Sequence, residues 1–435
     1  MVKPQNLLAV LSALVPSIAA LPIEDTGAGF ASYIISLKRG LNDSDIDSHY
    51  DFANDMHRRA LARRGVSLSP TTGETGIMSR HEINEHRSYA AVFDEATREA
   101  IASHPPVALV ERNEIISIGH QSDAPWGLVS MSLNWTSGTP LAADSYRFYK
   151  DGQGQGMTAY VVDTGVRITH GDFEKRAGYG ANFIKTEDHV DGTGHGTHVA
   201  GTIGGKTFGV AKQINIISVK VLDKEGNGPM AQTLEGFQWA YQHARRNKRL
   251  NKSLVNYSAG GEGATSAAIR DAILEMKKAG MAVFVSAGND DMNVDNAWPA
   301  NVPEVFTVAS AGNTGNRLWR ARSSNYGKLV DMFGPGVNIL SCGHKSDKAT
   351  ARLSGTSQAT PHVTGFAATL KSRLGSKVDS VDTLYKTVLS YAVRGRVEDA
   401  KGSPNLFLAN GLEVVVRPPT PGPGSGTGLP VKPPM

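Results

Sequence analysis

The distribution of apolar residues changes in a regular way along the second part of the chain. From about residue 157 onward, runs rich in Val and Ile alternate with segments whose apolar residues recur every three or four positions. The runs predict strands at 157–163, 214–222, 252–258, 281–287, 304–310 and 329–333. Segments 229–249 and 266–280 predict amphipathic helices. Because apolar strands separated by helices are typical of sheets buried on both faces, we expect an α/β fold with a mostly parallel sheet and helices on both faces.

Residues 32–118 show a different and more local pattern. Strands are predicted at 32–38 and 86–93, and one or two strands at 107–118. Residues 43–64 have helical periodicity, and a second short helix follows Asp94, an acceptor suited to cap its first turn. This order predicts a small α+β module of the ferredoxin-like, split β-α-β kind.

The two ends of the chain differ from both regions. Lys3 precedes an apolar stretch that stops at Ala19–Ala20, as in a secretory signal peptide, here residues 1–20. No later segment is apolar over the length that a membrane-spanning helix needs, so we expect a secreted, extracellular protein without membrane contact. Residues 411–435 are rich in Pro and Gly and predict a disordered tail.

Composition narrows the class of function. The chain has 435 residues, 40% of them hydrophobic, which suits one large domain and a smaller one. Its formal net charge of +4 is mild and its basic residues are scattered, so we expect no nucleic-acid partner. The single cysteine, Cys342, follows the apolar run VNIL and predicts a buried core thiol rather than a reactive one.

Three motifs place polar side chains where strands end or helices begin. AYVVDTGV puts Asp163 directly after an apolar strand, DGTGHGTHVAGTIGG puts His195 between glycines at a helix start, and SGTSQATPHVTG puts Ser357 at another. Each has an ordinary alternative, such as a turn for Asp163 or an N-cap for Thr356 or Ser357. A zinc site at His195 and His198 lacks a third ligand. The glycines beside His195 predict a close approach of another segment.

Asp163, His195 and Ser357 occur in the order of the acid, base and nucleophile of subtilisins. The chain resembles the subtilisin-like serine proteases, and within them the secreted fungal proteinase K type. The resemblance implies a subtilisin-like fold, an inhibitory propeptide at 21–116 and a catalytic domain at 117–410. It also implies a serine endopeptidase that works through an acyl-enzyme, is made as a self-processing zymogen and acts as a monomer on extended polypeptides.

The same resemblance assigns roles to residues. Ser357 is the nucleophile, activated because His195 takes its proton, and Asp163 orients the His195 ring. Asn289, in FVSAGND, matches the oxyanion asparagine of the family, with an Asx-turn as the structural alternative. APWGL resembles the start of mature family members, so the first cut is expected between residues 116 and 121.

The resemblance also locates the substrate. Peptides bind in this family between two edge segments, which match 224–229 and 257–263 here. The residues expected to contact substrate are Gly226, Gly228, Ser258, Ala259 and Gly260. Ala259 stands where leucine is common and should enlarge or flatten a hydrophobic subsite, and Gln358 stands where methionine is common. Glu262 is expected to add acidity at the pocket rim.

No cofactor is expected for the chemistry, but the resemblance implies a structural calcium ion. Its ligands would be the carbonyl groups of Pro303 and Val305 and the carboxylate of Asp331, for which a plain turn role is the alternative. Sequons for N-glycosylation stand at Asn42, Asn134, Asn251 and Asn256. The first would leave with the propeptide and the last lies in a predicted buried strand, so the middle two are the better candidates.

Two other functions, nucleotide binding and an inactive binding protein, are less well supported by the sequence. AGTIGGKT, residues 200–207, fits a loose phosphate-loop pattern, but such a loop follows a strand and opens a helix, and here that order is reversed. An inactive secreted relative that acts as a binding protein is disfavoured, because all four candidate catalytic residues are present.

Overall fold

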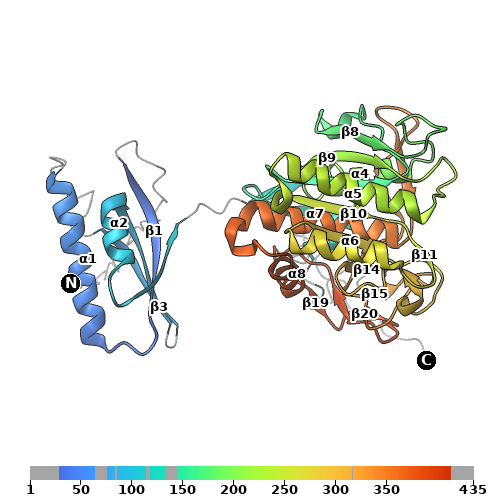
Figure 1. Cartoon of the computed structure of the whole chain (residues 1–435). Helices are drawn as coiled ribbons and strands as arrows, with labels where there is room; N and C mark the ends of the chain where they lie inside the picture. The colour runs from blue at the N-terminus through green and yellow to red at the C-terminus, as the bar shows by residue number, and fades with distance from the viewer. Residues whose placement is uncertain are drawn as a thin grey trace, which may run out of the picture. The chain divides into compact units, whose positions relative to one another are not determined.

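The computed structural model describes residues 29–63, 76–83, 86–113, 118–133, 135, 145–315 and 317–412. The chain divides into two compact units, Met1–Ile116 and Ser117–Met435 (Figure 1). The predicted signal peptide and most of the predicted tail lie outside the described residues, as does Asn134. Among the described helices, none is long and apolar enough to cross a membrane.

The N-terminal unit is a four-stranded antiparallel sheet with two helices, in the strand order β2-β3-β1-β4. Its elements are β1 (Phe30–Leu37), α1 (Asp43–Arg63), β2 (Ile77–Ile83), β3 (His86–Asp94), α2 (Glu95–Ala102) and β4 (Val107–Arg112). Alternate residues of β1 and β3, such as Ile35 and Phe93, pack with α1 residues such as Ala53 in one core. Asp94 caps α2 by accepting from the backbone N–H of Thr97 at 2.9 Å. The ferredoxin-like order is thus as predicted.

The strand β2 was not predicted. Its sequence, IMSRHEI, is mostly polar in its middle, and its pairing with β3 shifts register between Ile77 and Ser79. This edge strand lacks the strict alternation of apolar and polar residues that is typical of a half-buried strand. Among the described strands it has a neighbour on one side only, so hydrogen bonds with β3 hold it in place.

The second unit is built on a largely parallel sheet in the order β16-β14-β12-β10-β7-β9-β8, continued beyond β16 by β21 and β19. The parallel strands are β7 (Thr158–Asp163), β8 (Ala177–Asn182), β9 (Asn215–Lys220), β10 (Ser253–Tyr257), β12 (Ala282–Ser286), β14 (Phe306–Thr314) and β16 (Met332–Pro335). Each residue of β7, β10 and β12 is buried, as expected for strands covered on both faces.

Two pairs of helices cover this sheet (Figure 1). α4 (His195–Gly204) and α7 (Thr356–Leu374) pack together on one face, and α5 (Met230–Arg246) and α6 (Ala267–Lys278) lie on the other. α4 and α7 approach closely because small residues line their contact, and a side chain at Gly365 would meet the backbone oxygen of Ile203 at 2.9 Å. The α/β fold with helices on both faces is confirmed.

Smaller elements complete the second unit. They are β5 (Ile118–Gln121), α3 (Trp126–Ser130), β6 (Tyr146–Tyr149), β11 (Gly261–Glu262), β13 (Ala297–Trp298), β15 (Arg317–Arg320), β17 (Ile339–Cys342), β18 (Thr350–Leu353), α8 (Val381–Ser390), β19 (Val393–Arg394), β20 (Val397–Glu398) and β21 (Leu406–Phe407). Cys342 is fully buried, as predicted. The sequence did not predict β8, whose glycine-containing AGYGAN carries no apolar run, and β16 begins three residues later than expected.

Candidate active site

Three elements of the second unit bring the motif residues to one place. Asp163 is the last residue of β7, His195 the first of α4 and Ser357 the second of α7. His195 and Ser357 line one cleft of about 450 Å³ together with Asn289. Parallel strands present their carboxyl ends, and the helices that follow them, at one edge of a sheet, which is where this cleft lies.

Asp163 and His195 are directly bonded. The distance between His195 Nδ1 and Asp163 Oδ1 is 2.7 Å, and the Asp163 side chain is fully buried. The same carboxylate oxygen also accepts the backbone N–H of Thr164 at 2.7 Å. Burial by itself lowers the pKa of His195, but the charge of Asp163, its hydrogen bond and the charge of Asp191 outweigh burial, so the pKa is raised. The protonated ring is therefore stabilised where a proton acceptor is needed.

The Ser357 hydroxyl has a different partner in this conformation. It donates to the backbone carbonyl oxygen of Ser258 at 2.9 Å, not to His195. The Ser258 hydroxyl in turn donates to the Ser357 carbonyl oxygen at 3.1 Å. That carbonyl is available because Pro361, four residues later in α7, has no N–H to complete the usual helical bond. Pro361 thus frees an acceptor that ties the start of α7 to the Ser258 segment.

Asn289 lies beside the start of α7. Its Oδ1 accepts from the backbone N–H of Thr356 at 2.9 Å and from the Thr356 hydroxyl at 3.2 Å. This arrangement fixes the amide and leaves its NH₂ group as the donor that remains for the cleft. The first-turn N–H groups of α7 lie at the same end, where a helix carries partial positive charge. Together they can stabilise a negative oxygen.

Most of the predicted substrate residues line the cleft, but not all. Gly226, Ser258, Ala259 and Gly260 line it, whereas Gly228 lines a neighbouring hollow. Gly228 is constrained locally, because a side chain there would meet the Val221 carbonyl oxygen at 2.3 Å.

The acidity expected from Glu262 comes from other residues. Glu262 pairs with Ala297 in the small β11–β13 sheet and is not part of the cleft lining, which is a correction to the expectation from sequence. The acidic lining residues are Glu225 and Asp290. Trp298, also missed, lines the pocket from β13, because that strand is paired with β11 from a distant part of the chain.

Asp191 is a further site residue that the motifs did not single out. Its buried carboxylate accepts from the backbone N–H groups of Gly194 and Thr197 at 2.8 Å and from the hydroxyl groups of Thr164 and Thr197 at 2.8 and 2.6 Å. It therefore holds the turn that leads into α4. An aspartate four residues before His195, among glycines and threonines, was the only signal in the sequence.

The glycines beside His195 are needed for close packing, as expected. Gly194 has φ +91°, and a side chain there would meet His344 at 2.2 Å. A side chain at Gly196 would meet the Gly165 carbonyl oxygen at 2.1 Å.

Of the expected calcium ligands, only Asp331 would contribute a side chain, and its carboxyl group lies partly buried beside β14. Asp331 Oδ2 accepts the backbone N–H of Thr307 at 2.7 Å, and burial raises the pKa of Asp331 to about 7. A partly buried carboxylate that is costly to ionise suits a hard cation, which would offset that cost. Among the described residues, no group of three or more His, Cys, Asp or Glu side chains could hold a metal ion, so backbone oxygens such as those of Pro303 and Val305 would have to complete the shell.

One of the expected glycosylation sites is incompatible with the fold. Asn256 is fully buried in β10, and its amide bonds to Ser258 Oγ at 2.9 Å and to Thr364 Oγ1 at 2.8 Å. Both amide atoms are engaged in the core, so a glycan cannot occupy this side chain. Asn42 and Asn251 are exposed.

Known families match both units of the chain. Residues 154–408 match the subtilase family, peptidase family S8, and residues 32–118 match the peptidase inhibitor I9 family. Alkaline protease 1 of Aspergillus oryzae is 38% identical over 413 residues, which cover 93% of this chain and 98% of that protein. Subtilisin-like protease 5 of Arthroderma gypseum is 41% identical over 353 residues, 80% of this chain and 83% of that protein.

A solved structure agrees with the sequence matches. The crystal structure of a cold-adapted subtilisin-like serine proteinase is similar with a TM-score of 0.58 and 36% identity, and the match covers 66% of this chain and 99% of that one. The chain therefore belongs to the subtilase family and is a serine endopeptidase that carries a peptidase inhibitor I9 domain ahead of its catalytic domain.

Proposed function

We propose that the protein hydrolyses polypeptides through an acyl-enzyme, with Ser357 as nucleophile, His195 as base and Asp163 as the residue that orients His195. The observation that carries this is the 2.7 Å contact between His195 Nδ1 and Asp163 Oδ1 in the cleft that also holds Ser357 and Asn289. The two ring nitrogens of His195 therefore have different roles. Nδ1–H donates to the Asp163 carboxylate, and Nε2 remains free to accept a proton.

The reaction follows from these positions. The Ser357 oxygen attacks the peptide carbonyl carbon while its proton passes to His195 Nε2, and the new oxyanion is stabilised by the Asn289 NH₂ group and the N–H groups at the start of α7. The C–N bond then breaks as His195 returns the proton to the leaving amine. Water repeats the sequence on the ester, which releases the acid and restores the serine.

Substrate binding prepares the nucleophile. In the free enzyme the Ser258 carbonyl oxygen accepts the Ser357 hydroxyl. An extended peptide that pairs with the Ser258–Gly260 edge supplies a backbone N–H for this carbonyl and so releases the hydroxyl to turn toward His195.

The chain is made, in this proposal, as an exported precursor. Residues 1–20 direct secretion, residues 21–116 inhibit the enzyme, and residues 117–410 form the catalytic domain, which acts outside the cell as a monomer. The support is the match of residues 32–118 to an inhibitor family and the apolar N-terminal stretch. Asn251 is the glycan site best supported by exposure. A calcium ion at Asp331 stabilises the fold and takes no part in the chemistry.

The test is the Ser357→Ala variant, expressed in a host without other secreted proteases. We expect no peptide hydrolysis and an unprocessed precursor, because the first cut needs the chain's own nucleophile. N-terminal sequencing of the wild-type product should find a start between residues 117 and 121. A Ser357→Ala protein that cleaves peptides or matures unaided contradicts the proposal.

A further inference from the structure

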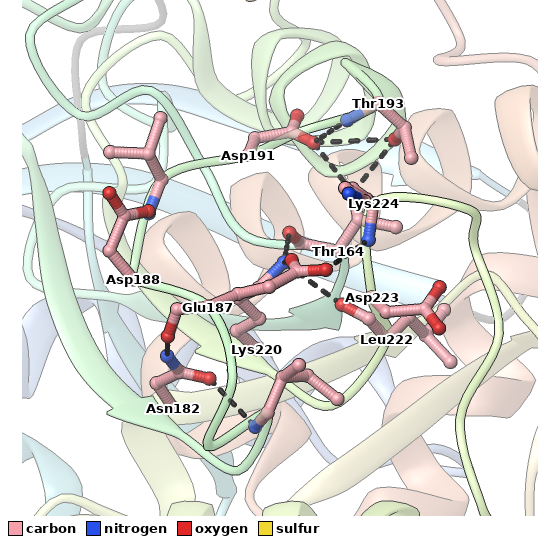
Figure 2. Close-up of polar contacts among 12 residues, drawn as sticks. Thr164, Asn182, Glu187, Asp188, Asp191, Thr193, Lys220, Leu222, Asp223 and Lys224 are labelled. Carbon is pink, nitrogen blue, oxygen red and sulfur yellow. Dashed lines mark hydrogen bonds and ion pairs between the residues drawn. The ribbon is translucent and has the colours of Figure 1, made fainter.

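An ion pair between a fully buried lysine and a partly exposed glutamate lies next to the strand of the proposed catalytic aspartate, where Asp163 of β7 pairs with Lys220 of β9. Lys220, the last residue of β9, has a fully buried side chain, and its Nζ lies 3.1 Å from Glu187 Oε2. The same ammonium group donates to the backbone carbonyl oxygens of Thr164 at 2.6 Å and Leu222 at 3.0 Å (Figure 2). All three N–H bonds of the lysine are therefore used.

Glu187 links Lys220 to the substrate segment that begins at Lys224. Its second oxygen, Oε1, accepts the backbone N–H of Lys224 at 3.0 Å, and its own backbone carbonyl accepts from Asn182 Nδ2 at 2.7 Å (Figure 2). The hydrogen bond from Lys224 holds the pKa of Glu187 below its usual range, against the effect of burial, and Lys220 adds to that lowering. The carboxylate is thus stabilised in its charged form.

The backbone groups bound by this pair belong to two parts of the site, the turn that follows Asp163 and the substrate edge 224–229. Thr164 follows Asp163, and its hydroxyl contacts Asp191 and the backbone N–H of Gly196 in the turn beside His195. Leu222 lines the cleft, and its backbone N–H donates to the Asp163 carbonyl oxygen at 3.3 Å.

Lys224 opens the segment 224–229, whose residues Glu225 and Gly226 line the same cleft. The pair therefore joins the turn that carries the catalytic acid to the edge along which a peptide would lie.

Stability alone is a weak reason for such a pair. Removing the Lys220 charge from water costs several kcal/mol, and well-packed apolar residues often replace such a pair at no loss of stability. Charge-assisted hydrogen bonds do fix geometry, however, and a shift of about 1 Å at a catalytic group can cost roughly 100-fold in rate.

We infer that Glu187 and Lys220 are positioning residues of this endopeptidase, which hold Asp163 and the substrate edge 224–229 in register with each other. Lys220 acts on the catalytic acid through the Thr164 carbonyl, and Glu187 acts on the substrate edge through the Lys224 N–H. This inference rests on the proposed role of Asp163 in the triad.

Three variants separate positioning from stability. Lys220→Met removes the ammonium and nearly keeps the side-chain length, Glu187→Gln keeps one acceptor but loses the charge, and the double variant Glu187→Leu/Lys220→Met leaves no unpaired buried charge. Lys371→Met is the matched control, because Lys371 is a buried lysine in α7, fourteen positions beyond Ser357. Active sites are counted by stoichiometric labelling of Ser357 with a sulfonyl fluoride, so that misfolded protein does not enter the rates.

Each variant is assayed on a one-residue and a four-residue peptide amide with the same residue before the cut. Only the longer substrate can pair with the edge 224–229. For Lys220→Met we expect kcat to fall about tenfold on both substrates. For Glu187→Gln we expect the main effect to be a severalfold rise in KM for the long substrate, with kcat on the short one within about twofold. Lys220→Arg should recover part of the kcat lost in Lys220→Met.

The double variant decides between the two roles. A pair that serves only stability predicts that the apolar replacement regains wild-type kcat together with a near-normal unfolding temperature. The positioning role predicts a near-normal unfolding temperature with kcat still about tenfold low, because the Thr164 carbonyl and the Lys224 N–H have lost their partners.

Two results overturn the inference: recovery of kcat in the double variant, or equal losses per active site in Lys220→Met and Lys371→Met. If Lys220→Met yields no labelled sites, Glu187→Gln and the double variant give the answer. Ser357→Ala, run in parallel, reports separately on the proposed function, which fails if that variant still cleaves the short substrate or matures unaided.

Discussion

Each of the two compact units holds a histidine with a shifted pKa, and the partners of these two histidines differ. In the catalytic unit, His195 lies 2.7 Å from a carboxylate, and its pKa is raised although burial alone lowers it. In the N-terminal unit, His49 bonds to His104 at 2.8 Å and to the Tyr89 hydroxyl at 2.9 Å, and burial together with His104 lowers its pKa to about 4. Loss of solvation lowers the pKa of both histidines, so the partner decides whether such a histidine is a base or a neutral core residue.

The same contrast occurs within one helix. His198 follows His195 by three residues in α4, is fully buried and bonds to the Ile339 carbonyl oxygen at 2.9 Å. Burial lowers its pKa to about 4. A neutral acceptor does not offset the loss of solvation as a carboxylate does. Position in a helix therefore says little about the chemistry of a histidine.

The largest expected effect comes from removing the carboxylate partner. Asp163→Asn keeps the shape of the site but should lower kcat by about 10⁴-fold, because the amide favours the wrong tautomer of His195. It should also lower the pKa of His195. Since the neutral ring is the active form, the acid limb of the kcat/KM profile should then move to lower pH, as measured on enzyme processed in trans. An unmoved acid limb would show that Asp163 does not control the protonation of His195.

Asn289→Ala should change rate without changing this titration. Loss of one oxyanion donor costs about 10²–10³-fold in kcat with little change in KM, because the donor acts mainly in the transition state. Asn289 bonds to Thr356 and not to His195, so the acid limb should stay where it is in wild type. Steady-state kinetics over a range of pH measure both the loss of kcat and the position of the acid limb. A loss confined to KM would instead assign Asn289 to ground-state binding.

Acid should destabilise the N-terminal unit through His49. The folded pKa of about 4 lies below the unfolded value of 6.5, so the unfolded chain binds more protons between these values. The stabilisation is present above pH 6.5 and is lost as the pH falls toward 4. In the uncleaved Ser357→Ala precursor, we expect the first unfolding transition to fall by on the order of 10 °C between pH 7 and pH 5.

A matched pair of variants tests this origin. His49→Gln should flatten the pH dependence of that transition, whereas His81→Gln, at an exposed histidine of β2, should leave it unchanged. Equal pH dependence in the two variants would remove His49 from the explanation.

The smallest expected effect concerns the partly buried carboxyl group of Asp331. Its pKa is raised rather than lowered, so it should destabilise the fold as the pH rises. The pKa of Asp331 is raised from 3.8 to about 7, so its stabilising contribution is present at low pH and is lost as the pH rises through 7. Without calcium, the unfolding temperature of the catalytic unit should fall by roughly a few degrees between pH 5 and pH 8, and calcium should reverse part of this. Asp331→Asn should abolish both responses, while Glu275→Gln, at an exposed position of α6, should not. Calcium stabilisation that survives in Asp331→Asn would place the ion elsewhere.

Periodicity along the chain was sufficient for the elements that form the core. The strands β7, β10 and β12 and the helices α5 and α6 were predicted, because each buries a continuous or regularly spaced apolar set. The order of the three motifs also predicted one site, because it resembles the order of the acid, base and nucleophile in subtilisins.

Elements with little burial of their own were missed for the same physical reason. β2 is polar and β8 is rich in glycine, and both are edge strands that exist because a neighbour offers hydrogen bonds. The local sequence of an edge strand does not show whether a neighbouring strand will supply these hydrogen bonds.

The remaining features depend on contacts between distant parts of the chain. Sequence alone identified the candidates for acid, base and nucleophile, because the three motifs that carry them are local and resemble those of subtilisins in the same order. Only the tertiary structure decided that the Ser357 hydroxyl bonds to Ser258, ninety-nine positions away, and that Lys220 meets Glu187 behind the site. It also decided that both amide atoms of Asn256, which the sequence placed in a buried strand, bond to side chains of the core. Burial and the partner at hydrogen-bond distance are set by which strands become neighbours, and that choice is made by the packing of the whole sheet.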